Sequence, residues 1–246
     1  MRPTIGITSS FALNEETDPP RERAYLLAAY TDAIFAAGGI PYPLPVPPAY
    51  DTAVIDSLLS RCDGVLFTGG YDLHPRNFGQ EPHPETVTLH ERRDPYELHL
   101  YRRADERRMP IFAICLGFQV VHVARGGRLI QHVDDLTLTP TITHHLPRDG
   151  NAFHKVRVEG DSRLAKIVGG TEIETNSRHH QVVDPDHQGT GLRPVAFAPD
   201  GILEASEDCD GRYLVAVQWH PEDLIDRPVH LRLFEALVEA AAAGVS

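Results

Sequence analysis

The feature that most constrains the fold is a repeated alternation of short apolar segments with helical segments in the first half of the chain. Strands are expected at 4–8, 40–44, 63–67 and 110–114, and helices at 25–37, 51–59, 94–108 and 116–124. Continuous apolar strands separated by helices are typical of a parallel sheet buried on both faces. The pattern predicts an α/β fold with a mostly parallel central sheet and helices on both faces.

The second half of the chain differs, because from Thr137 onward its segments are shorter and alternate between apolar and polar residues. Strands are expected at 155–158, 172–175, 195–198, 202–205 and 214–218, before a closing helix at 229–243. Residues 75–95 lack a period and are expected to form a long surface loop. A chain of 246 residues with 41% hydrophobic content is expected to form one domain, 1–246, with antiparallel β segments added to the parallel sheet.

Charge and cysteine content exclude several classes of protein. A net charge of -12 would repel nucleic-acid phosphates and an anionic membrane surface, so neither is expected as a partner. Cys62, Cys115 and Cys209 lie far apart, which argues against a disulfide framework and favours a reducing cytoplasm. No apolar run approaches the roughly 20 residues that a membrane helix needs.

Residues Ala113–Gly117 form the most informative local motif, an apolar strand that breaks into a helix at Cys115. A nucleophile elbow has this arrangement, and it would expose the sulfur at a helix N-terminus, where a thiolate is favoured. An isolated cysteine in apolar surroundings is more often a small buried hydrophobic residue. The motif alone therefore does not establish a reactive thiol.

A histidine and a carboxylate leave the last expected strand together in Gln218–Glu222. Residues i and i+2 of an extended segment share a face, so Glu222 could hold one nitrogen of His220 while the other faces Cys115. That set would supply a nucleophile, a base and a group that orients the base. Alternatively, His220 is one of 14 histidines and Glu222 merely begins the next helix.

Taken together, these motifs resemble the class I glutamine amidotransferase family. Cys115 in its elbow, with Gln119 close behind and Gln218–Glu222 downstream, carries the resemblance. Three further segments resemble its γ-glutamyl-γ-aminobutyrate hydrolase (peptidase C26) branch along nearly the whole chain: Gly69–Pro75, Arg93–Asp94 with Glu97, and Asn176–Gln181.

The resemblance implies a flavodoxin-like three-layer fold, a Cys115–His220–Glu222 triad and a γ-glutamyl thioester intermediate. It also implies an oxyanion hole formed by the backbone N–H groups of Gly70 and Leu116. Gly70 follows a strand and Leu116 begins a helix, so both N–H groups could point at the developing oxyanion. Residues expected near the glutamyl group are Gln119, Ser177, Arg178, His179 and His180. Leu116 stands where the family often has arginine, which puts substrate choice in doubt.

No metal or other cofactor is expected. The pairs His144–His145 and His179–His180 suggest a metal site, but adjacent side chains point apart in an extended chain and no carboxylate joins either pair at ligand spacing.

The expected function is hydrolysis of a small-molecule γ-glutamyl amine to glutamate and the free amine. A glutaminase subunit that supplies a separate synthetase, a hydrolase of folate polyglutamates and a non-catalytic module of the same fold stay open as alternatives. The identity of the amine and the pathway also stay open. A homodimer is expected only because most soluble oligomers are homomeric.

Overall fold

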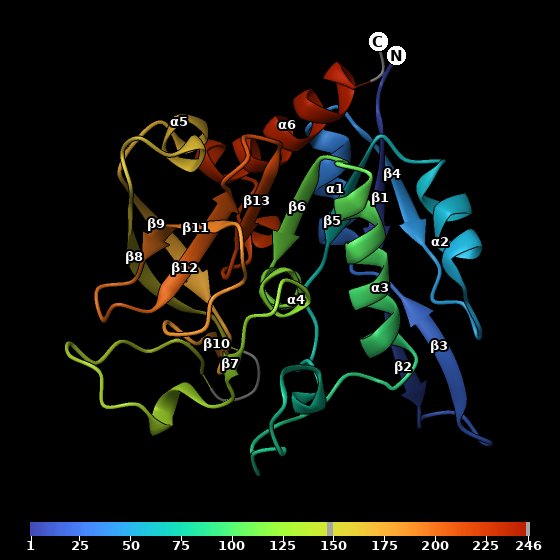
Figure 1. Ribbon diagram of the computed structural model, residues 1–246, viewed down its shortest axis with the longest axis horizontal. Helices are drawn as coiled ribbons and strands as arrows, with labels where there is room; N and C mark the ends of the chain where they lie inside the picture. Colours follow the sequence, from blue (N-terminus) through green and yellow to red (C-terminus); the bar gives the residue numbers. More distant parts are fainter. Residues whose placement is uncertain (147–149, 245–246) are drawn as a thin grey trace.

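The computed structural model describes residues 1–146 and 150–244, and its centre is one nine-stranded sheet (Figure 1). The strands in spatial order are β4 (Ile40–Leu44), β1 (Thr4–Thr8), β5 (Gly64–Phe67), β6 (Ile111–Ile114), β13 (Leu214–Val217), β12 (Leu203–Asp208), β11 (Leu192–Phe197), β8 (Ala152–Val158) and β9 (Glu172–Ser177). The order confirms the predicted α/β fold.

The sheet has a parallel half and an antiparallel half that meet at β13. Neighbouring strands are parallel from β4 through β1, β5 and β6 to β13. They are antiparallel from β13 through β12, β11 and β8 to β9. The β-rich second half of the chain thus continues the same sheet. Because β13 lies beside β6 and runs parallel to it, the segments that follow these two strands leave the sheet at the same end.

Helices cover both faces of the sheet, and each face has its own apolar core (Figure 1). One face packs against α2 (Thr52–Leu59), α3 (Arg93–Glu106) and α4 (Leu116–Ala124). The other packs against α1 (Ala28–Ala36), α5 (Arg163–Val168) and α6 (Pro228–Ala243). Within β6, Ile111 and Ala113 face the first core while Phe112 and Ile114 face the second, as the period of two in a strand requires.

Several short elements lie outside the expected pattern. A hairpin of β2 (Ser10–Asn14) and β3 (Arg21–Tyr25) precedes α1, so the helix expected from residue 25 begins at Ala28. Strands β7 (Leu129–Ile130) and β10 (Val182–Val183) form a separate pair, and the expected loop at 75–95 opens with a 3₁₀ turn at Pro75–Phe78. Short 3₁₀ turns also occur at Val133–Asp135 and Pro221–Asp223.

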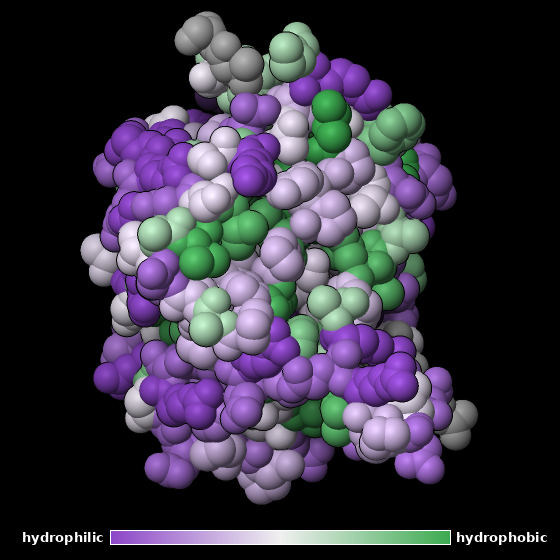
Figure 2. All heavy atoms as spheres, turned by 90° about the vertical axis from the view of Figure 1, so that its right-hand side faces the viewer, coloured by the Kyte–Doolittle hydropathy of each residue, from purple (hydrophilic) through white to green (hydrophobic). Residues whose placement is uncertain are grey.

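Strand β4 forms one exposed edge of the sheet, and two prolines limit its ability to pair with another chain. Pro41 and Pro43 have no backbone N–H to donate, which is a common way to protect a sheet edge. Figure 2 views the molecule from the side that carries β4 and α2, where apolar side chains lie among weakly polar ones in the middle of the face. Within the described residues, no helix has both the length and the apolar character needed to cross a bilayer.

Candidate active site

Cys115 occupies the sharp turn between β6 and α4, in a backbone conformation that side chains rarely adopt. Its φ of 52° and ψ of -101° lie in a strained region that usually costs about 1–3 kcal/mol and persists where the surroundings enforce it. Gly117 permits the turn, because a Cβ there would lie 2.6 Å from the carbonyl oxygen of Phe67. The sequence thus builds the elbow that the Ala113–Gly117 motif predicts.

His220 and Glu222 follow β13 at the same end of the sheet at which Cys115 follows β6. The Cys115 N–H donates to the carbonyl of Val217 at 2.8 Å, which fixes the two strand ends to each other. Nδ1 of His220 lies 2.6 Å from Oε1 of Glu222. With Nδ1 occupied by the carboxylate, Nε2 is the nitrogen left to interact with the Cys115 sulfur.

The electrostatics of this group favour a charged imidazole. Burial lowers the pKa of His220, but the charges of Glu222 and Cys115 and hydrogen bonds to both outweigh burial and raise it. Burial likewise raises the pKa of Glu222, but His220 outweighs this and lowers it. All three side chains are more than nine-tenths buried, so little water screens these interactions.

Two residues outside the predicted set hold this group in place. The Asn176 side chain donates to the backbone carbonyl of His220 at 2.9 Å and accepts the His220 N–H at 3.0 Å. The Tyr30 hydroxyl accepts the N–H of Gly69 at 3.0 Å and lies close enough to Glu222 to lower the pKa of that carboxyl. The Asn176–Gln181 motif could have indicated Asn176 as a site residue. Nothing in the helical pattern around Tyr30 distinguishes it from a core residue.

The structure brings Gly70 and Leu116 together beside Cys115. A Cβ on Gly70 would lie 2.9 Å from Cδ2 of Leu116, so the chain after β5 passes closely over the start of α4. As the first residue of α4, Leu116 has a backbone N–H with no acceptor in its own helix. Gly70 and Leu116 therefore lie next to each other, and their role as an oxyanion hole stays a prediction.

The buried ion pair of Arg93 and Glu97 packs against Gly69 and Gly70. Arg93 bonds Glu97 at 2.5 Å and also donates to the carbonyl of Gly69 at 3.2 Å and to the hydroxyl of Thr68 at 3.1 Å. A Cβ on Gly70 would lie 2.5 Å from Nη1 of Arg93, so only glycine fits there without displacing the arginine. These contacts explain why Gly70 and Arg93, two of the residues that carry the family resemblance, occur together.

Two of the predicted substrate-binding residues, Arg178 and His180, are partly exposed. Arg178 lies 3.5 Å from Glu222 and 2.7 Å from Asp223. Burial lowers its pKa, but the charges of Asp223, Glu222 and Cys115 outweigh this and raise it, so the guanidinium stays charged. His180 lies 3.0 Å from Asp72 and thereby joins the Asn176–Gln181 segment to the loop that follows β5.

The other three predicted substrate-binding residues make their hydrogen bonds away from the triad. The Gln119 amide donates to the carbonyl of Gln181 at 3.1 Å, which links the Asn176–Gln181 segment to α4. The Ser177 hydroxyl donates to the carbonyl of His144 at 2.7 Å. His179 is buried beside Glu204, at 3.5 Å. These three side chains therefore hold the Asn176–Gln181 segment in place.

Comparisons with known proteins identify relatives along almost the whole chain. A family model described as Peptidase C26 matches residues 3–222. A Mycobacterium tuberculosis protein provisionally named a glutamine amidotransferase is 38% identical over 98% of this chain and 75% of its own length. The γ-glutamyl-γ-aminobutyrate hydrolase of Escherichia coli K12 is 33% identical over 78% of this chain and 76% of its own length.

A solved structure shares the fold at low sequence identity. The glutaminase domain of Trypanosoma brucei CTPS superposes with a TM-score of 0.68 at 17% identity, covering 98% of this chain and 94% of that domain. The match confirms the predicted class I glutamine amidotransferase-like fold.

Proposed function

The chain belongs to the peptidase C26 family, and from this premise we propose that it is a cysteine hydrolase that cleaves the γ-glutamyl amide bond of a γ-glutamyl amine to glutamate and the free amine. The observation that carries the proposal is the buried His220–Glu222 pair beside the strained elbow of Cys115. A nucleophile, a base and an orienting carboxylate in this arrangement serve acyl transfer.

The first half of the reaction forms a thioester. The Cys115 sulfur attacks the γ-carbonyl carbon, and the negative charge that develops on its oxygen is met by the N–H groups of Gly70 and Leu116. His220 carries the proton from the thiol and gives it to the amide nitrogen, so the C–N bond breaks and a neutral amine leaves. Glu222 stabilises the imidazolium that exists between these two transfers.

The second half of the reaction restores the enzyme. Neutral His220 takes a proton from water, and the resulting hydroxide attacks the thioester carbonyl through the same oxyanion site. The C–S bond breaks, the sulfur regains a proton from His220, and glutamate is released. Each proton taken by the imidazole is returned within one half-reaction, so no external acid is needed.

Arg178 is the group that we assign to recognition of the glutamyl α-carboxylate. It is a charged, partly exposed guanidinium within 3.5 Å of Glu222, so a carboxylate bound to it would lie near the triad. Asp223 holds the other side of the guanidinium at 2.7 Å, which fixes its direction. A planar guanidinium can bind a carboxylate through two parallel hydrogen bonds.

A glutaminase is the second candidate, because the same thioester chemistry releases ammonia from glutamine. The name carried by the Mycobacterium tuberculosis relative, at 38% identity, favours it. The two candidates differ only in the leaving group, ammonia or a substituted amine. Substrate preference therefore separates them.

The deciding experiment measures glutamate release from a panel of γ-glutamyl amines and from glutamine, using wild type and the Cys115→Ala variant. The Cys209→Ala variant is the control, since Cys209 is exposed and lies in no part of the site. We expect turnover of a γ-glutamyl amine above that of glutamine, lost in Cys115→Ala and kept in Cys209→Ala. Turnover of glutamine alone would favour the glutaminase, and silence on the whole panel would favour a non-catalytic module.

A further inference from the structure

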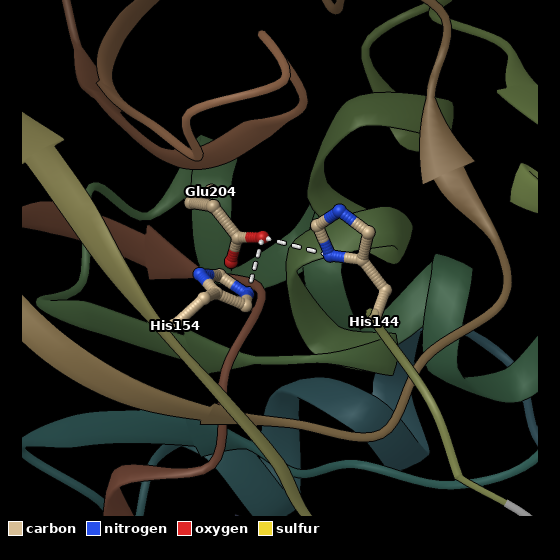
Figure 3. A group of neighbouring side chains, drawn as sticks. All are labelled: His144, His154 and Glu204. Atoms are coloured by element: carbon tan, nitrogen blue, oxygen red, sulfur yellow. Dashed lines mark ion pairs between the residues drawn. The ribbon is translucent and has the colours of Figure 1, made fainter. Parts of the chain in front are cut away.

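A second group of buried polar side chains lies in the antiparallel half of the sheet, around Glu204. This carboxylate, on β12, is fully buried. One nitrogen each of His144, His154 and His179 lies 3.5 Å from the same Glu204 oxygen, Oε1. Figure 3 shows His144 and His154 directed at the carboxylate from two different segments of the chain.

The atoms that meet there are buried and have no hydrogen-bond partner within the described chain. They are Nδ1 of His144, Nε2 of His154, Nε2 of His179 and both oxygens of Glu204. A separation of 3.5 Å exceeds the usual N–H···O distance of about 2.7–3.2 Å. Leaving a buried polar atom unsatisfied costs about 1–3 kcal/mol, so five such atoms around one point call for a common partner.

The opposite nitrogen of each ring faces a carboxylate or carbonyl oxygen, which accepts a hydrogen bond from the ring N–H. Nε2 of His144 lies 2.8 Å from Oδ2 of Asp200. Nδ1 of His154 lies 3.3 Å from the carbonyl of Lys155, and Nδ1 of His179 lies 3.1 Å from the carbonyl of Gln181.

These contacts place the ring protons on the outer nitrogens and direct the lone pairs of the inner ones toward Glu204. Metal-binding histidines almost always have such an outer partner, either a carboxylate or a backbone carbonyl. Here one of the three partners is a carboxylate and two are carbonyls.

We propose that Glu204, His144 and His154 bind a divalent transition metal ion, preferably Zn²⁺, while His179 lies beside them at 3.5 Å from the same Glu204 oxygen. The ligand atoms of Glu204, His144 and His154 lie within 4.8 Å of one another. Two ligands about 2.1 Å from a tetrahedral zinc ion are roughly 3.4 Å apart, close to the 3.5 Å that separates each imidazole from Glu204. Imidazole with one carboxylate suits zinc better than calcium or magnesium, which prefer oxygen ligands.

The sequence pattern could not reveal this site, because its ligands come from three separate parts of the chain. Neither histidine pair has a carboxylate directly beside it in the sequence, whereas Glu204 lies far along the chain from both. His145 in fact turns away from its neighbour and lies 3.1 Å from Asp134. His180 likewise bonds Asp72, so each pair contributes one histidine to the Glu204 group.

A metal at this place would be structural, since its three ligands are buried side chains of the antiparallel half of the sheet. It would join β12, β8 and the loop that precedes β8, next to the segment after β9 that carries Arg178 to the triad. The His179 N–H also bonds the carbonyl of His144 at 3.1 Å, so the same segment is already tied to the loop that precedes β8.

The rival account is a proton in place of the metal. Burial lowers the pKa of His144, but Asp200 and Glu204 outweigh this and raise it to about 9. A protonated His144 would partly neutralise Glu204 without any ion. The two accounts differ in whether the purified chain contains metal and in whether added metal changes its stability.

The test measures metal content by plasma mass spectrometry in the full chain, purified without a histidine tag, and in two variants of the site, Glu204→Gln and His154→Asn. The control is His145→Asn, which removes a histidine next to a proposed ligand but outside the Glu204 group. We expect about one metal ion per chain in wild type and in the control, and at least tenfold less in both site variants.

A second measurement uses the wild type alone and stands even if the variants fail to fold. Protein stripped with a chelator is titrated with Co²⁺ and, separately, with Zn²⁺. We expect the visible absorption of tetrahedral Co²⁺ at one equivalent and a higher Tm with Zn²⁺. A wild type that holds no metal, shows no such absorption and keeps its Tm would overturn the proposal, as would metal lost from His145→Asn but kept by Glu204→Gln.

Discussion

Asn176 is predicted to control activity by holding the backbone of His220, and Asn176→Ala tests this. The substitution removes two buried hydrogen bonds, of 2.9 and 3.0 Å. At about 0.5–1.5 kcal/mol each, their loss should lower the free energy of unfolding by about 1–3 kcal/mol. At about 2–4 °C per kcal/mol for a chain of this size, Tm should fall by roughly 2–12 °C.

The effect on rate should exceed what this loss of stability explains. With its backbone released, the imidazole can shift relative to Cys115, and a displacement of about 1 Å can cost on the order of 10²-fold in rate. We expect kcat for the best γ-glutamyl amine to fall by roughly 10–100-fold at a temperature where the variant is fully folded. Alkylation of Cys115 by iodoacetamide should slow as well, which gives a reading that needs no substrate.

Thr175→Val is the matched control for this experiment. Thr175 lies in the same strand, is equally buried and makes only a 3.5 Å contact with the carbonyl of His154. Its variant should keep wild-type kcat. If Asn176→Ala loses stability but keeps kcat within about twofold, the reasoning fails, because β13 and Glu222 would then suffice to position His220.

Three further predictions concern charge. Glu222→Gln should move the basic limb of the kcat/KM profile to lower pH, because the Glu222 charge raises the pKa of His220; an unmoved limb would mean that the carboxylate does not stabilise the imidazolium. Arg178→Gln should raise KM for γ-glutamyl amines by roughly tenfold or more with a smaller change in kcat, and an unchanged KM in steady-state assays would remove Arg178 from substrate binding. Burial, with a smaller contribution from Arg125, lowers the pKa of His122 to about 3, so the folded state resists a proton that the unfolded chain takes up near pH 6.5. Stability should therefore be lost as pH falls, and denaturant titrations at pH 7 and 5 should show His122→Gln losing about 2 kcal/mol less than wild type; equal losses would contradict this.

Sequence reasoning was most successful where one local pattern determines one element. The expected strands at 4–8 and 40–44 and the expected helix at 116–124 match β1, β4 and α4 to the residue. Continuous apolar runs, glycine pairs and the break at Cys115 are all local, so they can be read without the fold. Strands β9 and β12 extend beyond the expected ranges, because their ends carry polar residues that are buried in the fold. Strand β8 begins three residues earlier than expected, at Ala152.

The site was predictable to the extent that its residues share a motif. Gln218–Glu222 predicts the contact between His220 and Glu222, and the structure has it at 2.6 Å. Tyr30 and the Glu204 group could not be predicted, because their partners lie far away in sequence. Tyr30 meets the segments that follow β5 and β13, and Glu204 meets its histidines only when β8 and β12 are part of one sheet. His179 shows the same limit, since adjacency to His180 suggested a shared role and the two side chains in fact serve different contacts.

The most direct test of the central claim is the mass of Cys115-containing peptide after acid quenching of the enzyme during turnover of a γ-glutamyl amine. The proposed mechanism predicts a γ-glutamyl adduct on the sulfur of Cys115, lost on treatment with hydroxylamine, which cleaves thioesters. An adduct on any other residue, or undiminished glutamate release by the Cys115→Ala variant in the same assay, would contradict the assignment of Cys115 as the nucleophile.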